Sequence, residues 1–217
     1  MKLARVTNHT HWFGVALLFI SSILLLMVTI SAPVTHHLGL LSVQLGNTTT
    51  DQGHQSTIHF GTLGYCTSNT AQGGDVCTGR HIGYNPAHVM ASIDNTQFGY
   101  LSAGTSDSLT RVMVLHPIAC GVTFIAFLLS IGAGIVGSLA SFFAALLAWA
   151  LTFIVMATDF VLFGIVRRHV NDGQGSPAQA HFSKAIWMLV VAFLLELLGM
   201  VIVLFTCLSA RRTKKKG

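Results

Sequence analysis

The sequence predicts an all-α membrane protein, a four-transmembrane-helix bundle with a small disulfide-stapled β-sheet in an extracellular loop. Three observations lead to this fold class. Hydrophobic residues make up 52% of the 217 positions and charged residues only 9%, whereas a soluble domain needs a far more charged surface. Four apolar stretches reach the length of roughly 20 residues that crosses a bilayer. A polar segment with two cysteines, 33–113, separates the first stretch from the second.

The first apolar stretch, Phe13–Ile30, stops before Pro33. Because Lys2 and Arg5 precede it, a cleaved signal peptide is the alternative interpretation, and cleavage would leave three spans and an outside amino terminus. The apolar run is long for a signal core, however, and Ala32 followed by proline makes a poor cleavage site. We therefore expect this stretch to be retained as a span.

The other three stretches are bounded by proline or by basic residues. The second, Ile118–Val136, starts directly after Pro117, and proline suits a first helical turn. The third, Leu139–Val166, is long enough to tilt or to extend beyond the lipid. The fourth is Ala185–Leu208. The predicted parts are a cytosolic N-terminus (1–12), four spans (13–32, 114–136, 139–166 and 185–208), two extracellular loops (33–113 and 167–184), a cytosolic turn (137–138) and a basic cytosolic tail (209–217).

The distribution of charge places both termini in the cytosol. The two ends hold seven of the 12 basic residues, namely Lys2, Arg5, Arg211, Arg212, Lys214, Lys215 and Lys216. The opposite side holds the other five, and the positive-inside rule therefore favours cytosolic termini, although Arg167 and Arg168 oppose it. In this orientation the glycosylation sequon at Asn47 and the pair of cysteines lie outside, where both modifications form.

The loop 33–113 is expected to form a small antiparallel sheet. Partial alternation of apolar residues in Thr57–Leu63 predicts one strand. Two further strands are expected at Leu40–Leu45 and near His81–Tyr84.

Cys66 and Cys77 in this loop are predicted to form a disulfide. On the chain-entropy model, closing so short a loop contributes about 2.5–3 kcal/mol, which matters for a sheet with little core. Two free thiols are one alternative. A metal site with His59 and His81 is another, although zinc usually takes more closely spaced ligands.

Three segments match a known pattern. The first is Phe60-Gly-Thr-Leu-Gly-Tyr-Cys66, followed by Cys77 and by Gly83-Tyr84. The second is Ser108-Leu-Thr-Arg-Val-Met-Val-Leu-His-Pro-Ile-Ala-Cys-Gly121, and the third is Ala157-Thr-Asp-Phe-Val-Leu-Phe-Gly-Ile-Val-Arg167. Within a four-pass, claudin-like layout they resemble the fungal Sur/PalI membrane family, and specifically its PalI branch, from the first span to about Ser209. The matching motif residues include Gly64, Tyr65, Gly83, Tyr84, His116, Pro117 and Asp159.

The resemblance implies a plasma-membrane protein of the fungal ambient-pH pathway, in which PalI-type proteins assist a separate polytopic pH sensor. The Sur-type branch instead organises cortical, eisosome-type membrane patches and affects the cell wall, and this scaffold role is the alternative function. Many PalI proteins carry a long cytosolic tail that this sequence does not include, so no role of such a tail is carried over.

Asp159 and Glu196 are the only acids within the predicted spans, where an ionised carboxylate is costly. No Lys or Arg lies in the same apolar runs. We expect both acids to hydrogen-bond across helices, to groups such as Thr152 or Thr158, or else to act as proton-responsive sites. Histidine titrates near neutral pH, and His116, at the membrane boundary, is the strongest candidate for proton sensing among the 11 histidines.

Small residues predict close packing of the second and third spans. Ala140, Ala144 and Ala148 recur every four residues on the third span, and glycines crowd the end of the second. Self-association through these residues is the alternative to packing within the chain. The basic tail, with Arg211, Arg212, Lys214, Lys215 and Lys216, is expected to contact anionic lipids of the inner leaflet.

The sequence contains no zinc-protease motif, nucleophile elbow, phosphate-binding glycine loop or inverted transporter repeat. We therefore predict a protein that is not an enzyme, uses no cofactor and binds neither a metal nor nucleic acid. A channel is disfavoured because the spans offer few polar side chains to line a path.

Overall fold

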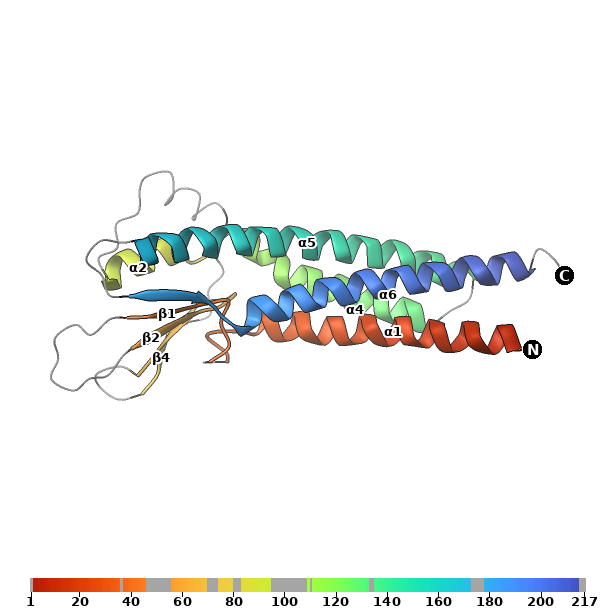
Figure 1. Ribbon diagram of the computed structural model, residues 1–217, viewed down its shortest axis with the longest axis horizontal. Coiled ribbons are helices and arrows are strands. Elements are labelled where there is room, and N and C mark those ends of the chain that lie inside the picture. Colours follow the sequence, from red (N-terminus) through yellow and green to blue (C-terminus); the bar gives the residue numbers. More distant parts are fainter. Residues whose placement is uncertain are drawn as a thin grey trace. The chain divides into compact units, whose positions relative to one another are not determined.

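The computed structural model describes residues 2–35, 37–45, 56–69, 74–79, 83–94, 109, 111–132, 135–172 and 178–214. Its elements are shown along the chain in Figure 1. In chain order they are α1 (Lys2–Thr29), β1 (Leu41–Gln44), β2 (Thr57–Phe60), β3 (Tyr65–Ser68), β4 (Val76–Cys77), α2 (Pro86–Asp94), the 3-10 helix η1 (Arg111–Val114), α4 (Leu115–Ile131), α5 (Ile135–Asp172), β5 (Gln179–Phe182) and α6 (Lys184–Lys214).

Four helices in the described part of the chain are long and apolar enough to cross a membrane. They comprise His9–Thr29, Arg111–Ile131, Leu139–Asp172 and Lys184–Thr206. Together with the antiparallel sheet they confirm the predicted fold class, a four-helix membrane bundle with a small sheet.

The helices extend beyond several of the expected boundaries. α1 begins at Lys2, so the expected N-terminal tail is largely helical, and α6 continues to Lys214. Residues 137–138, expected as a turn, lie inside α5, which begins at Ile135. At its other end α5 continues past Val166, the expected end of the third span, to Asp172.

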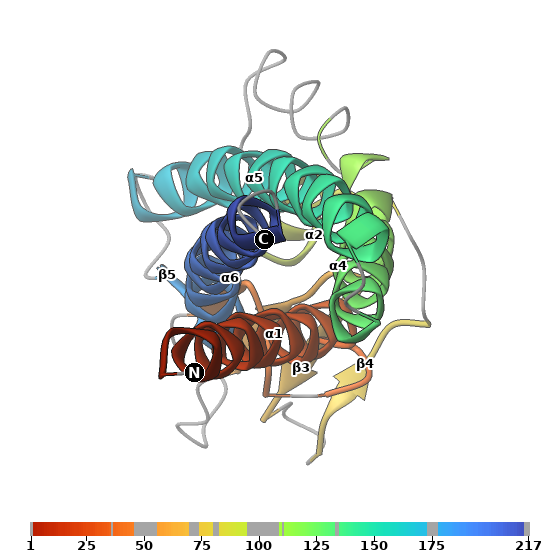
Figure 2. The same cartoon turned by 90° about the vertical axis from the view of Figure 1, so that its right-hand side faces the viewer.

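The chain forms two compact units. The helix unit consists of Met1–Leu26, Pro117–Ile154 and Leu189–Gly217, and the sheet unit of Met27–His116 and Val155–Met188. Figure 2 shows α1, α4, α5 and α6, which supply the helix unit, close to end-on. Its core contains Leu18, Ala126, Ala145, Met200 and Val203.

Small residues pack the helix unit, at two of the three alanines expected on the third span and at further positions. In the part of α5 that belongs to this unit, the buried residues are Ser141, Ala145, Ala148 and Thr152. Ala144 is partly buried against the core, whereas Ala140 is exposed. A glycine contact that was not predicted joins α1 to α6, since a Cβ on Gly199 would lie 3.0 Å from Leu18 Cγ and 3.1 Å from the Gly14 carbonyl oxygen. These contacts let the backbones approach closely, as small residues do in membrane helices.

The sheet unit contains a five-stranded antiparallel sheet in the order β4-β3-β2-β1-β5. The strands expected around Leu40–Leu45 and Thr57–Leu63 are present as β1 and β2. The prediction of a strand near His81–Tyr84 is wrong at Gly83 and Tyr84, which do not lie in a strand. His81 lies outside the described residues. β3, β4, β5 and α2 were not predicted.

β5 comes from the segment 167–184, which the sequence indicated only as a loop. It pairs with β1 in the register Leu41↔Phe182, so segments from both expected loops join one sheet. The side chain of Asn171 on α5 holds this edge strand: its Nδ2 donates to Ala180 O at 3.1 Å and its Oδ1 accepts from Ala180 N at 2.7 Å. The amide thereby occupies backbone groups that an edge strand otherwise exposes.

Candidate functional site

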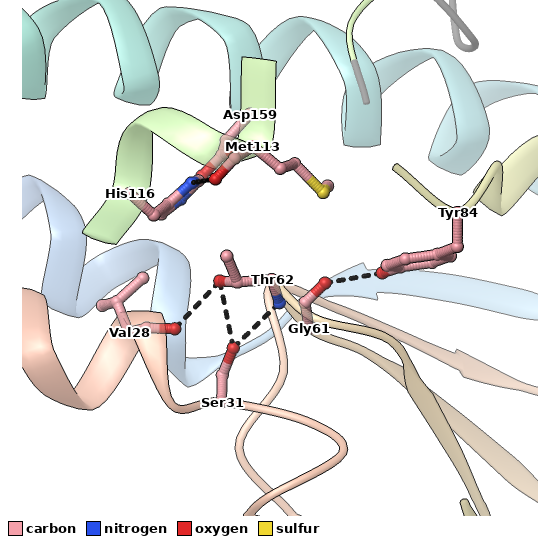
Figure 3. A network of polar contacts seen from close by, with 8 residues as sticks. All are labelled: Val28, Ser31, Gly61, Thr62, Tyr84, Met113, His116 and Asp159. Carbon is pink, nitrogen blue, oxygen red and sulfur yellow. Dashed lines mark hydrogen bonds and ion pairs between the residues drawn. The ribbon is translucent and has the colours of Figure 1, made fainter. Parts of the chain in front are cut away.

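The segment that follows β2 fastens the sheet to the end of α1. Thr62 Oγ1 donates to the carbonyl of Val28 at 2.9 Å, and Thr62 N donates to Ser31 Oγ at 3.0 Å (Figure 3). The carbonyls of a last helical turn have no partner within the helix. Thr62 therefore caps the C-terminal end of α1 and holds the residues after β2 against it.

Gly61 makes the closest approach in this junction. A Cβ at this position would lie 2.4 Å from the carbonyl oxygen of Ala32 and 2.5 Å from its nitrogen. The carbonyl of Gly61 accepts a hydrogen bond of 2.6 Å from the hydroxyl of Tyr84 (Figure 3). Burial raises the pKa of Tyr84 well above its usual value of 10.0, and the charge of Asp159 acts in the same direction. Tyr84 is therefore a permanent donor at physiological pH.

The next residues of the motif, Gly64 to Cys66, lead into β3 and connect it to β4 at the edge of the sheet. Gly64 has a φ of +153°, and a Cβ there would lie 2.6 Å from Thr78 Oγ1. Cys66 and Cys77 face each other directly across β3 and β4 and form a disulfide. The predicted disulfide is confirmed, and the alternatives of free thiols or a metal site at these cysteines are excluded.

His116 and Asp159, which the sequence singled out separately, form a buried pair in the sheet unit. His116 Nε2 lies 2.9 Å from Asp159 Oδ2, and His116 Nδ1 lies 3.2 Å from the carbonyl oxygen of Met113 (Figure 3). Their side chains are only 2% and 1% exposed. Asp159 thus pairs with a histidine, whereas a threonine such as Thr152 or Thr158 had been expected as its partner.

Hydrogen-bond chemistry fixes the number of protons in this pair. Because a carbonyl only accepts, His116 Nδ1 carries a hydrogen. The contact with Asp159 then holds one further proton, on Nε2 in an imidazolium–carboxylate pair or on Oδ2 in a neutral pair. Both forms have zero net charge, which suits a site buried from water. The pair can release or gain a proton only by becoming charged.

The remaining predicted residues are dispersed. Gly83 has a φ of +84° and precedes Tyr84, and Pro117 lies in the first turn of α4. Glu196 lies in the helix unit, where it contacts Thr123. Asn47, Lys215 and Lys216 lie outside the described residues, whereas Arg211, Arg212 and Lys214 are in the last turns of α6.

Sequence reasoning missed Ser31, Gly61 and Thr62 as junction residues. Gly61 and Thr62 lay within the recognised motif, but their partners at the end of α1 are about 30 positions away, as shown by the separation of 31 between Thr62 and Ser31. Within the described residues, no group of three or more His, Cys, Asp or Glu side chains is placed to hold a metal ion. The chemistry that this site offers is the holding of a proton.

A second titratable position lies on the sheet, outside the spans. Burial lowers the pKa of His59 from its usual 6.5, and the neighbouring His37 lowers it further, while Asp75 opposes the shift. The rings of His37 and His59 lie edge to face with centroids 6.1 Å apart. Protonating His59 therefore places a charge in a half-buried site beside another imidazole.

We expect this histidine to make the protein less stable in acid. With a lowered pKa in the folded state, His59 contributes stability that is present above about 6.5 and is lost as pH falls below it, since the unfolded chain then binds more protons. His59→Gln should flatten the dependence of the thermal unfolding temperature on pH between roughly 7 and 5. His181 pairs with Ser42 from the other side, as His59 does, but it is exposed. His181→Gln should therefore leave the pH dependence of the unfolding temperature unchanged. An unchanged acid slope in His59→Gln would contradict this expectation.

Comparison with known proteins identifies relatives of this chain. Residues 10–199 match the family model described as the SUR7/PalI family. The pH-response regulator protein palI/prr-5 of Neurospora crassa is 33% identical over 115 residues, which are 53% of this chain and 14% of that protein. The pH-response regulator protein palI/RIM9 of Emericella nidulans is 27% identical over 117 residues, 54% of this chain and 18% of that protein. Its counterpart in Pyricularia oryzae is 32% identical over 81 residues, 37% of this chain and 10% of that protein. The chain thus spans less than a fifth of each of these relatives.

Proposed function

Since this chain belongs to the SUR7/PalI family, we propose that it is a non-catalytic plasma-membrane protein of a fungal ambient-pH response, in which it assists a separate polytopic pH sensor. The observation that carries this proposal is that three relatives are each named as pH-response regulators. The four membrane-spanning helices suit a role beside another membrane protein.

In the proposed orientation the sheet unit faces the outside and both termini are cytosolic. The Cys66–Cys77 disulfide supports this orientation, because disulfides persist in oxidising compartments. The basic residues at the end of α6 then lie at the inner leaflet, where anionic lipids attract them. The sheet unit is the part that meets the external medium.

Within this function we assign the response to protons to the His116–Asp159 pair. The pair holds a single proton between two buried side chains and lies in the sheet unit with the Tyr84 and Thr62 junction. A change in its charge would alter contacts on α4 and α5 together. His116→Gln is accordingly expected to shift the pH at which the pathway responds while leaving the amount of protein at the surface unchanged.

The proposed function is tested by deleting the gene in its own organism. Deletion should abolish growth at alkaline pH and lower the amount of the pH sensor at the cell surface, and the full chain should restore both. Normal alkaline growth combined with wall defects and loss of immobile membrane patches would overturn the proposal in favour of a cortical scaffold. A fluorescent fusion of the full chain, imaged in the same cells, separates these outcomes.

A further inference from the structure

His11 on α1 joins three helices of the helix unit. His11 Nε2 lies 3.2 Å from the carbonyl oxygen of Ser130 on α4, and His11 Nδ1 lies 3.2 Å from Thr206 Oγ1 on α6. Ser130 is in turn joined to α5, because its hydroxyl is hydrogen-bonded to the hydroxyl of Ser141. One polar residue from each of the four helices therefore belongs to a single connected network, and all of these residues lie in the helix unit.

The contact with α4 fixes one hydrogen of the His11 ring. α4 ends at Ile131, so the carbonyl of Ser130 is one of the last four, which have no partner within a helix. A carbonyl only accepts, and His11 Nε2 must therefore carry a hydrogen. His11 thus caps the C-terminal end of α4, where the partial negative charge of a helix end favours a cation.

The contact with α6 can be made in two ways. Thr206 Oγ1 also lies 3.0 Å from the carbonyl oxygen of Ile202 and 2.9 Å from that of Val203, on its own helix. The hydroxyl has only one hydrogen to donate. In a neutral ring Nδ1 is an acceptor, so the hydroxyl must leave these carbonyls to donate to His11. In an imidazolium Nδ1 donates to the hydroxyl, the hydroxyl donates to a carbonyl of α6, and every polar group in the contact is paired.

The position of His11 makes the ring reachable from water. Its side chain is partly buried, and the two residues before it, His9 and Thr10, are exposed. Trp12, the residue after it, is 53% exposed, and tryptophan is enriched at the boundary between a membrane and water. The span itself begins at His9. A proton can therefore reach the ring without crossing the apolar interior of the span.

The charged groups near the ring include no acid. On α4 and α5 no Asp, Glu, Lys, Arg, His or Cys lies within two turns of Ser130 or Ser141 in the sequence. On α1 and α6 the ionisable residues within two turns of His11 or Thr206 are Arg5, His9, Cys207, Arg211 and Arg212. Of these, only His9 has a side chain that the structure describes, and it is exposed. The nearby basic residues oppose a further positive charge, whereas the helix end and the two oxygen acceptors favour it.

We propose that His11 is a further proton-binding site, separate from the His116–Asp159 pair, at the side of the membrane on which the termini lie. Binding of the proton reverses the hydrogen bond with Thr206, so that both ring nitrogens donate and hold α1 to the ends of α4 and α6. In the proposed orientation this side is the cytosol, and that clause alone rests on the proposed function. The chain then carries one proton site in each unit, and the site in the helix unit responds to cytosolic pH.

Nitrogen-15 NMR of the full chain, labelled at histidine and held in lipid nanodiscs, tests the proposal over the range of about pH 8 to 5 in which histidine changes charge. At the alkaline end the His11 ring should be the tautomer with its hydrogen on Nε2. At the acid end both nitrogens should carry hydrogen. A neutral ring at both ends of the range, or hydrogen on Nδ1 alone at the alkaline end, would overturn the inference.

Two variants assign the signals. His11→Gln should remove the His11 signals, and it is expected to fold because the glutamine amide can donate to Ser130 O in place of Nε2. His9→Gln is the matched control, since His9 is exposed and lies two positions earlier on the same helix. It should leave the His11 signals and their change with pH as they are in the parent chain.

The partner of Nδ1 is tested by Thr206→Val and Thr206→Ser. A hydrogen-bonded N–H in a partly buried site exchanges slowly with water, so its proton signal is visible. At the acid end of the range the Nδ1–H signal should be lost in the valine variant, which offers no acceptor, and kept in the serine variant. A signal that persists in Thr206→Val would overturn the reversal at Thr206. Growth at alkaline pH plays no part in these measurements, so failure here is distinct from failure of the proposed function.

Discussion

Replacing His116 by leucine, or Asp159 by valine, is expected to lower the free energy of unfolding by about 3–5 kcal/mol, the loss that follows when one partner of a buried pair is removed. In His116→Leu the carboxyl of Asp159 loses its 2.9 Å contact, and its other oxygen, Oδ1, already has no partner among the described residues. In Asp159→Val the Nε2 atom of His116 stays buried and loses its hydrogen-bond partner.

The double variant should be less damaging than the sum of the single variants. Removing both groups leaves no unpaired polar atom in the contact, and apolar replacement of a buried pair is often close to neutral. The measurement is a double-mutant cycle on the full chain in bicelles, read by chemical or thermal unfolding. Asp159→Asn provides the control, because its amide donates to Nε2 while Nδ1 still donates to Met113 O. Additive losses in the cycle would contradict a coupled pair.

The transmembrane segments could be predicted from the sequence because lipid imposes a length and a polarity on every span. Their ends could not. Residues 137–138 look like a turn by composition, yet they lie in α5, which begins at Ile135. The apolar pattern therefore locates each long helix but not the residue at which the helix begins or ends.

The sheet shows where local pattern stops being informative. β2 alternates, with Ile58 and Phe60 buried, and this was readable. β5 reads Gln-Ala-His-Phe and also alternates polar and apolar residues, but over only four positions in a segment that was predicted as a loop. It pairs with β1, and Asn171 binds its outer edge. Such strands are set by their neighbours, since strand propensity depends mainly on context.

The candidate site was predictable residue by residue but not as a pair. His116 stood out by its position at a span entry and Asp159 by its charge in an apolar run. Their contact joins positions 43 residues apart and depends on the register of α4 against α5, which no local pattern encodes. A threonine does contact the other acid, Glu196, but it is Thr123 on α4, which the sequence had not singled out.

Gly61→Val is expected to disrupt the junction between α1 and the sheet, with a loss of more than the 1–3 kcal/mol that overpacking a core usually costs. The added Cβ would meet backbone atoms of Ala32 at 2.4–2.8 Å. Backbone cannot rotate away as a side chain can, so the strand end must move from the helix end. That movement would also break the bonds from Thr62 to Val28 and from Tyr84 to Gly61.

Gly79→Ala is the matched control for this variant, because a Cβ at Gly79 meets nothing within 4 Å. Both proteins would be compared by thermal unfolding and by limited proteolysis of the segment between α1 and β2. Gly61→Val should unfold at a markedly lower temperature and be cleaved near the end of α1, while the control should match the parent chain. Equal stability of the two variants would mean that the segment after β2 can move away from Ala32 at no cost in free energy of unfolding. In that case the glycine would not be needed for close approach, and the hydrogen bonds of Thr62 and Tyr84 alone would hold the sheet to the helix.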